Sequence, residues 1–341
     1  MNFAIVGCGH IAKKHVEAIL LIEGAQLVAV CDTNESRLIE YIDAYGVAGY
    51  TKLSEMLLNP EIDVVNICTP SGLHAPLAVQ VANAGKHVIV EKPIALTLED
   101  ADLIINACQH NQVKLSVVHP NRFRPAVIEL KKAMDSGSFG KLSHANATVR
   151  WNRNQEYYDK DPWRGTKSLD GGVLMNQAIH NLDLLTWIMG DVKEVSSFTA
   201  TRLRNIEADD VAVGIVRFEN GALGVIEAAV TIYPKNLEET LSVFGDLGTV
   251  KIAGTTISTI EHWNVSDMNN DEVNQMLERI KHNPLGRPGH QCIIEDMIKA
   301  IQQDRQPMVN GEDGKKALKL ILALYSSAED GGKTVCLSQQ K

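Results

Sequence analysis

The first 118 residues alternate short runs of β-branched and aliphatic residues with longer stretches of helical periodicity. The hydrophobic runs predict strands, and the amphipathic stretches between them predict helices. The predicted strands are 3–6, 26–31, 63–68, 87–91 and 114–118, and the predicted helices are 11–23, 35–45, 75–84 and 98–110. Because strands separated by helices of this length pair in parallel, this part of the chain is predicted to form a doubly wound α/β sheet.

The hydrophobic pattern changes after Pro120. A helix is predicted at 125–135 and a strand at 143–151, and more strands follow between 194 and 262, with hairpin signals such as 219–222. Consecutive strands joined by tight turns pair antiparallel. This region is therefore predicted to be an α+β domain with an open, mainly antiparallel sheet.

A chain of 341 residues exceeds the size of one ordinary hydrophobic core. We therefore expect two domains, residues 1–120 with the parallel sheet and residues 121–341 with the antiparallel one. Helical periodicity at 289–303 and 313–329 predicts two further helices, and the pattern leaves open which domain they pack against.

Composition narrows the partners and the location. The net charge of −9 argues against nucleic acid or a membrane surface as a partner. No apolar run approaches the roughly 18 residues of a membrane span, and the sequence opens on a strand-forming run, so we expect a cytoplasmic protein. The six cysteines are scattered without CxxC spacing, so we expect buried thiols and no metal site.

A glycine motif separates the first predicted strand from the first predicted helix. Residues 7–12 read Gly-Cys-Gly-His-Ile-Ala, a GxGxxA pattern. In this context Gly7 permits a tight turn and Gly9 lets the backbone approach a pyrophosphate, while His10 and Ile11 offer helix N-terminal amides. The motif predicts a Rossmann domain that binds a dinucleotide.

The carboxylate of Asp32 follows the second predicted strand, 20 residues after Ala12. A carboxylate there accepts hydrogen bonds from ribose hydroxyls and repels a 2′-phosphate, so the expected cofactor is NAD rather than NADP. Arg37 is a further candidate contact, which either serves the cofactor or lies in solvent on the next helix.

Polar residues also follow the later strands of the parallel sheet, where ligands of such sheets bind. For two of them, Thr69 and His74, capping and packing of the loop are an equal alternative to cofactor contact. The candidate cofactor contacts at these strand ends are Thr69, Pro70, His74, Glu91, Lys92 and, just past the last strand, Asn121.

These motifs, with Gly171-Gly172 and the downstream Asn176 and His180, resemble the glucose–fructose oxidoreductase/inositol dehydrogenase/MocA family over essentially the whole chain. The resemblance implies an NAD-dependent oxidoreductase whose second domain often forms the oligomer interface. It also implies that Lys92 and His180 are catalytic. The family often has Asp where this chain has Asn176, so a base at that position is excluded and a neutral orienting group is expected.

The chemistry of alcohol oxidation agrees with these assignments, because a base must take the hydroxyl proton. Burial and a neighbouring cationic ring both favour a neutral amine at Lys92, and an imidazole such as His180 titrates near neutral pH. Asn176 and His180 have the i, i+4 spacing of one helix face. Asp183 continues this stripe and either orients the site or makes a structural bond.

The middle of the chain resembles one branch of the family, the UDP-N-acetyl-2-amino-2-deoxyglucuronate dehydrogenases of the WlbA type. The segments that carry this resemblance are 151–159, 163–166, 170–172, 175–177, 204–207 and 233–238. It implies oxidation of the 3-hydroxyl of UDP-N-acetylglucosaminuronate to a 3-keto sugar ahead of transamination. Neutral UDP-N-acetylglucosamine, a free sugar or an inositol are alternative substrates, and a non-catalytic NAD-dependent sensor is an alternative class.

A nucleotide sugar acid carries roughly three negative charges, which arginine binds well. Candidate cations are Arg122, Arg124, Arg153, Arg164, Lys167 and Lys235. The predicted substrate contacts are Lys92, Asn121, Arg153, Tyr157, Trp163, Arg164, Asn176 and His180, of which Trp163 and Arg164 are also candidate cofactor contacts. The resemblance further implies a homodimer or homotetramer and, in some relatives, reoxidation of the cofactor by 2-oxoglutarate.

Overall fold

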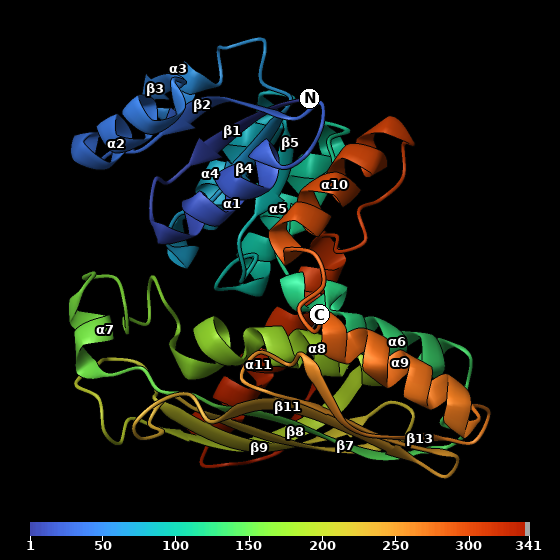
Figure 1. Ribbon diagram of the computed structural model, residues 1–341. Helices are drawn as coiled ribbons and strands as arrows, with labels where there is room; N and C mark the ends of the chain where they lie inside the picture. The colour runs from blue at the N-terminus through green and yellow to red at the C-terminus, as the bar shows by residue number, and fades with distance from the viewer. Residues whose placement is uncertain (338–341) are drawn as a thin grey trace. The chain divides into compact units, whose positions relative to one another are not determined.

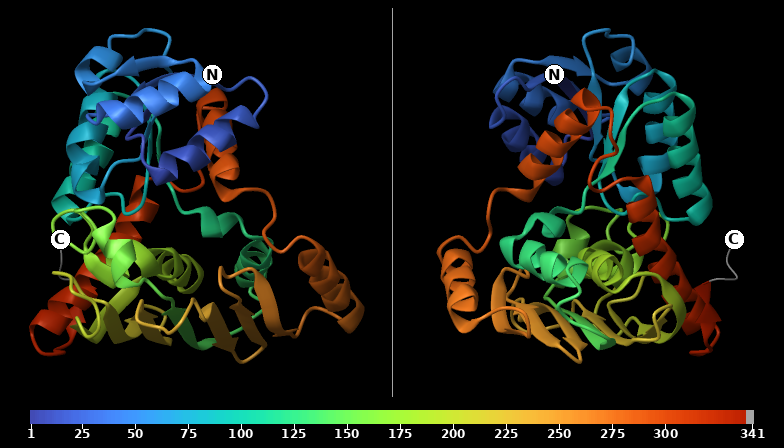
Figure 2. Two further views of the ribbon diagram at one scale, coloured as in Figure 1. Left: turned by 60° about the vertical axis from the view of Figure 1, so that its left-hand side comes forward. Right: turned by 90° about the vertical axis from the view of Figure 1, so that its right-hand side faces the viewer.

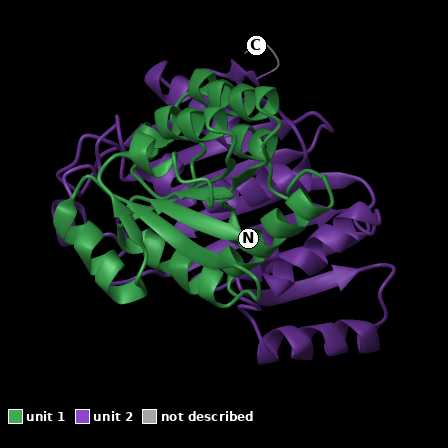
Figure 3. Ribbon diagram, turned by 90° about the horizontal axis from the view of Figure 1, so that it is seen from above, with its two compact units in different colours: residues 1–120, 288–315 green, residues 121–287, 316–341 purple. Residues whose placement is uncertain are grey.

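The computed structural model describes residues 1–337 of the chain. They form two compact units, one built from residues 1–120 and 288–315, the other from residues 121–287 and 316 onward (Figure 3). The predicted division had a single boundary at 120. The structure instead assigns 288–315 to the first unit, because helix α10 (Gly289–Gln302) packs against helix α1 (His10–Leu20) there.

The first unit is a parallel sheet, as predicted, and its strand order is β3-β2-β1-β4-β5-β6. Its strands are β1 (Asn2–Val6), β2 (Gln26–Cys31), β3 (Ala48–Tyr50), β4 (Val64–Ile67), β5 (His87–Val90) and β6 (Leu115–Val117). Its other helices are α2 (Glu35–Tyr45), α3 (Leu53–Met56), η1 (Ser71–Leu73), α4 (His74–Asn83) and α5 (Leu98–His110). Strand β3 was not predicted, because Ala-Gly-Tyr contains no hydrophobic run.

Helices cover both faces of this sheet, α1 and α10 on one and α4 and α5 on the other (Figure 2). Strands β1 and β4 are therefore buried on both faces, which explains why they are continuous apolar runs rather than alternating ones. Helix α1 buries Ala12, Val16 and Ile19, a stripe at helical spacing.

The second unit is an eight-stranded sheet in the order β13-β12-β11-β7-β10-β9-β8-β14. Its pairs are antiparallel except for β7 with β10, which confirms the predicted mainly antiparallel sheet. The strands are β7 (Leu142–Arg150), β8 (Val192–Ala200), β9 (Val211–Phe218), β10 (Leu223–Ala229), β11 (Glu238–Gly245), β12 (Gly248–Ala253), β13 (Thr259–Val265) and β14 (Val335–Cys336).

The helices of the second unit lie on one face of its sheet (Figure 1). They are η2 (Pro120–Phe123), α6 (Pro125–Asp135), α7 (Gln155–Asp159), η3 (Val173–Ala178), α8 (Ile179–Met189), α9 (Asn270–His282) and α11 (Gly311–Glu329), whose first residues belong to the first unit. Strand β9 alternates accordingly, since Ala212 and Val216 are buried while Val213 and Ile215 are exposed. Among the described residues, no helix is long and apolar enough to cross a membrane.

Candidate active site

The glycine turn between β1 and α1 has the shape of a phosphate cradle. Gly7 has φ +91°, and a Cβ there would lie 2.9 Å from the carbonyl group of Cys68. A Cβ on Gly9 would meet no atom within 4 Å, so space is open beside the first turn of α1. Within the described residues no side chain caps that turn. The amides of His10 and Ile11 can therefore receive a pyrophosphate.

Asp32 stands at the carboxyl end of β2 and is held by two backbone donors. Its Oδ2 accepts from the Cys8 amide at 2.7 Å, and its Oδ1 accepts from the Asn34 amide at 2.7 Å. Each carboxylate oxygen has a second lone pair, which can accept from a ribose hydroxyl. Arg37 is exposed on α2, and its contact with the cofactor stays a prediction.

Thr69 and His74 behave differently at the end of β4. The Thr69 hydroxyl is buried and makes no hydrogen bond within the described residues, so it is available to hydrogen-bond a ligand. The buried His74 ring lies between two carbonyl oxygens, 2.7 Å from that of Pro93 and 3.0 Å from that of Thr69. Burial lowers the pKa of His74. This side chain joins two strand ends, so the structure favours its packing role over cofactor contact.

Glu91 follows β5 and is buried beside the buried His15 and the partly buried His290, two histidines that the sequence analysis did not identify. Its Oε1 lies 3.0 Å from His15 Nε2 and 3.2 Å from His290 Nε2, and its Oε2 accepts from the Lys92 amide at 3.2 Å. Burial alone would raise the pKa of Glu91, but hydrogen bonds from the two imidazoles outweigh it and hold the pKa well below its usual range. Both carboxylate oxygens of Glu91 are thus engaged within the first unit, and its contact with the cofactor stays a prediction.

The Gly171-Gly172 turn precedes the segment that carries the predicted catalytic residues and is held by Asp209 and Tyr325. Gly172 has φ +91°, and a Cβ there would overlap the Asp209 carboxylate. Asp209 Oδ2 accepts from the Val173 amide at 3.1 Å, and the Tyr325 hydroxyl donates to the Gly171 carbonyl at 2.8 Å. Burial raises the pKa of Asp209 to about 6. The turn therefore requires glycine for both space and backbone conformation.

Asn176 and His180 are the two residues between Gly172 and Trp187 that are not buried. The sequence predicted that they lie one turn apart on a regular α-helix. In the structure Asn176 instead lies in the π-helical segment η3 and His180 in α8. Asn176 donates its side-chain amide to Asp170, whose Oδ2 accepts from the Gly165 amide at 2.7 Å. Both predicted catalytic side chains thus emerge from an otherwise buried stretch.

Asp183 and Arg122 form a buried ion pair. Arg122 Nε and Nη2 donate to the two carboxylate oxygens of Asp183 at 2.9 and 2.6 Å, and the guanidinium lies 4.8 Å from the Trp187 ring centre. This pair decides the open question about Asp183 in favour of a structural bond. Because the guanidinium of Arg122 is buried and bound by this carboxylate, the structure favours a structural role for Arg122 over substrate contact.

Arginine and aromatic side chains from 151 to 164 form a stack, here called the cation–aromatic ladder. Arg153 lies over Trp151 and Tyr157, with ring-centre distances of 4.9 and 5.4 Å. Arg164 lies over Tyr157 and Trp163 at 4.3 and 4.7 Å, and it donates to the Tyr157 hydroxyl. The structure therefore brings together the predicted substrate contacts Arg153, Tyr157, Trp163 and Arg164.

Asn121 contacts a carboxyl group that the sequence analysis missed. Its amide donates to Glu239 Oε1 at 3.1 Å, and burial raises the pKa of Glu239 to about 8. The strand pattern contained the signal, because Glu239 alternates with the core residues Leu241 and Val243 on the inward face of β11. His15 has a similar signal, since it borders the buried stripe of α1.

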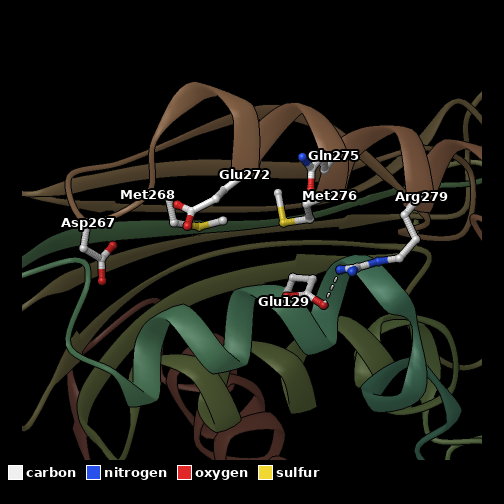
Figure 4. A pocket seen from close by; sticks show the side chains of 7 residues that line it. All are labelled: Glu129, Asp267, Met268, Glu272, Gln275, Met276 and Arg279. Atoms are coloured by element: carbon white, nitrogen blue, oxygen red, sulfur yellow. Dashed lines mark hydrogen bonds and ion pairs between the residues drawn. The ribbon is translucent and has the colours of Figure 1, made fainter.

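A hollow of about 420 Å³ elsewhere on the second unit includes none of the predicted residues (Figure 4). Its lining is Glu129, Asp267, Met268, Glu272, Gln275, Met276 and Arg279. In Figure 4, Arg279 reaches across it to pair with Glu129 at 2.9 Å. An acidic lining does not suit an anionic nucleotide.

The parallel sheet, the glycine cradle and Asp32 define an NAD-dependent oxidoreductase. Residues 1–119 match the family model described as an oxidoreductase family with an NAD-binding Rossmann fold, and residues 127–251 match the GFO/IDH/MocA C-terminal domain. The chain belongs to the GFO/IDH/MocA family.

Relatives of known activity support an enzyme rather than a sensor. Myo-inositol 2-dehydrogenase of Thermotoga maritima is 30% identical and aligns over 97% of both chains. The WlbA dehydrogenase of Bordetella pertussis, solved with NADH and UDP-GlcNAcA, is 37% identical with a TM-score of 0.94 over 98% of this chain and 97% of that one. The WlbA dehydrogenase of Chromobacterium violaceum, solved with the same two ligands, is 36% identical with a TM-score of 0.92 over 98% and 95%.

Proposed function

We propose that this enzyme oxidises the 3-hydroxyl of UDP-N-acetylglucosaminuronate to the 3-keto sugar that a transamination then consumes. The observation that carries the proposal is the cation–aromatic ladder. Guanidinium groups bind diphosphate or carboxylate, and ring faces stack on uracil or sugar, whereas an uncharged polyol needs no such set. The two WlbA structures bind this substrate and support the assignment at 37% and 36% identity.

In the proposed mechanism, NAD⁺ supplies the hydride acceptor when bound. Lys92 holds at its Nζ the proton that leaves the 3-hydroxyl. His180 binds the same hydroxyl oxygen, and Asn176 orients the sugar as a neutral group. Asn121, Arg153, Tyr157, Trp163 and Arg164 bind the rest of the nucleotide sugar.

Oxidation of a free sugar or inositol is the second candidate, favoured by the 30% identity to myo-inositol 2-dehydrogenase over nearly the whole chain. The test compares UDP-N-acetylglucosaminuronate, UDP-N-acetylglucosamine and myo-inositol as substrates of the purified protein. Each assay contains 2-oxoglutarate, because we propose it as the reoxidant of a tightly held cofactor, and a 3-aminotransferase to remove the keto product. A kcat/KM for inositol above that for the uronate would overturn the nucleotide-sugar proposal.

We further propose that the open face of the second unit's sheet joins copies of this cytoplasmic enzyme into a homodimer or homotetramer. Large apolar side chains of three neighbouring strands lie side by side on this face. The register places Phe198 of β8 opposite Val213 of β9, and Ile215 of β9 opposite Val225 of β10. These side chains are Phe198, Val213, Ile215, Leu223 and Val225, all 47% or more exposed.

A further inference from the structure

The cluster of His15, Glu91 and His290 lies in the first unit beside Lys92 and has no part in the proposed mechanism. His15 comes from α1, the helix that opens the cofactor cradle, and His290 from the start of α10. The two rings meet edge to face at 5.0 Å, and both Nε2 atoms converge on the same carboxylate oxygen.

Two imidazoles and a carboxylate are also a metal-ligand set, and their ligand atoms lie within 4.8 Å of one another. The second nitrogen of His15 favours a proton over a metal in this cluster. The side-chain amide nitrogen of Asn66 lies 2.9 Å from His15 Nδ1, and an amide nitrogen donates but does not accept. Nδ1 is therefore the acceptor, and the proton of the neutral ring sits on Nε2, where it donates to Glu91.

Glu91 connects this cluster to Lys92, the proposed base. One carboxylate oxygen is fixed by the two imidazoles and the other receives the Lys92 amide, so the backbone from which Lys92 extends is held by a buried anion. On the other side of Lys92, the carbonyl of Pro93 is held by His74. We propose that Glu91 is a positioning residue for Lys92. Glu91 fixes the backbone of Lys92 and keeps a negative charge near the Lys92 amine.

This inference rests on the proposed role of Lys92 as base. A negative charge near an amine stabilises the protonated form and so raises the pKa of the amine. Within the first unit, the other titratable groups around the cluster are Lys14 on α1, Cys68 after β4 and His74 on α4. None of them is altered in the Glu91→Gln variant.

The Glu91→Gln variant keeps the size of the side chain and removes its charge. We expect kcat/KM to fall 10- to 100-fold, NADH affinity to stay within threefold, and the acid limb of the kcat/KM–pH profile to move about one pH unit lower. His290→Gln, which keeps a donor, should retain more activity than His290→Ala. The control Gln291→Ala changes a neighbour that bonds only to Glu295 in the described contacts and should leave the profile unchanged.

A second measurement separates this inference from the substrate proposal. The pH dependence of Lys92 acetylation, followed by peptide mass spectrometry, reports its amine without turnover, and Glu91→Gln should shift it in the same direction. A lower thermal midpoint with both profiles unshifted would reduce Glu91 to a structural role. Stoichiometric zinc in the purified protein, lost in Glu91→Gln, would show that a metal and not hydrogen bonds holds the cluster, and would overturn this inference. If the wild type oxidises no sugar while the acetylation shift is found, only the substrate proposal fails.

Discussion

The side-chain amide of Asn176 donates to the carboxylate of Asp170, six residues earlier in the chain. A carboxylate only accepts, so the amide nitrogen faces Asp170 and the carbonyl oxygen is turned away from it. At the position where the family often has an acid, this chain therefore offers an oriented but uncharged acceptor.

Asn176→Asp should destabilise the protein although it restores the residue common in the family. Two carboxylates in contact cannot both ionise without cost, so one of them must bind a proton. Protonation is easier at low pH, and the loss of melting temperature should therefore be larger at pH 8 than at pH 5. Asn154→Asp is the matched control, because this exposed residue caps α7 and aspartate caps equally well. Equal losses at both pH values would contradict the contact.

Glu239→Gln should flatten the dependence of stability on pH. The folded-state pKa of Glu239 is raised from 4.5 to about 8, so its contribution is fully present below pH 4.5 and is lost as the pH rises toward 8. Glutamine keeps the acceptor for Asn121 without the charge. Thermal unfolding should show a variant several degrees more stable than the wild type at pH 9 and similar to it at pH 5. The neighbouring Glu238→Gln, in an ion pair with Arg150, should not show this pattern.

Lys92→Ala should abolish most turnover while dinucleotide binding persists. Loss of a general base costs roughly 10²- to 10⁴-fold in rate, and the cradle at Gly7 and Gly9 is unaffected. Steady-state kinetics and a fluorescence titration with NADH give the two quantities. Lys86→Ala, at a half-buried position just before β5, provides the control. Near-normal turnover in Lys92→Ala would exclude the lysine as base.

Arg164→Ala should weaken binding of the nucleotide sugar. Its guanidinium lies over Tyr157 and Trp163, and loss of a charge-assisted contact costs roughly 1.5–3 kcal/mol, which corresponds to about a 10- to 100-fold rise in KM. Lys160→Ala removes an exposed charge nearby without touching the ladder. A rise confined to the KM for NAD would show that Arg164 binds the cofactor rather than the nucleotide sugar.

Ile215→Glu should dissociate the proposed oligomer. A charge at the centre of an apolar sheet face is costly to bury against a second copy. Light scattering should report a smaller species, while Leu58→Glu, on a leucine of the first unit that is 81% exposed against 60% for Ile215, should leave the mass unchanged. An unaltered mass in Ile215→Glu would place the interface elsewhere.

The parallel sheet and the cofactor edge could be predicted from sequence because they depend on local periodicity and on one short motif. The contacts of Glu91 could not, since its partners are 76 and 199 residues away and no local pattern encodes such pairs. The membership of α10 was left open for a related reason, because an amphipathic stripe specifies that a helix packs but not on what. The π-helical segment could not be predicted, because Val173–Ala178 has the composition of an ordinary α-helix.

Helix α10 completes the first unit although it is encoded after most of the second. During synthesis, the first 120 residues leave the ribosome with the α10-facing side of α1 uncovered and with Glu91 lacking one of its imidazoles. The dinucleotide domain is therefore finished only after residues 288–315 have been synthesised. A gene fragment that stops at residue 120 would not reproduce it, whereas one in which 288–315 is joined to it by a short linker would.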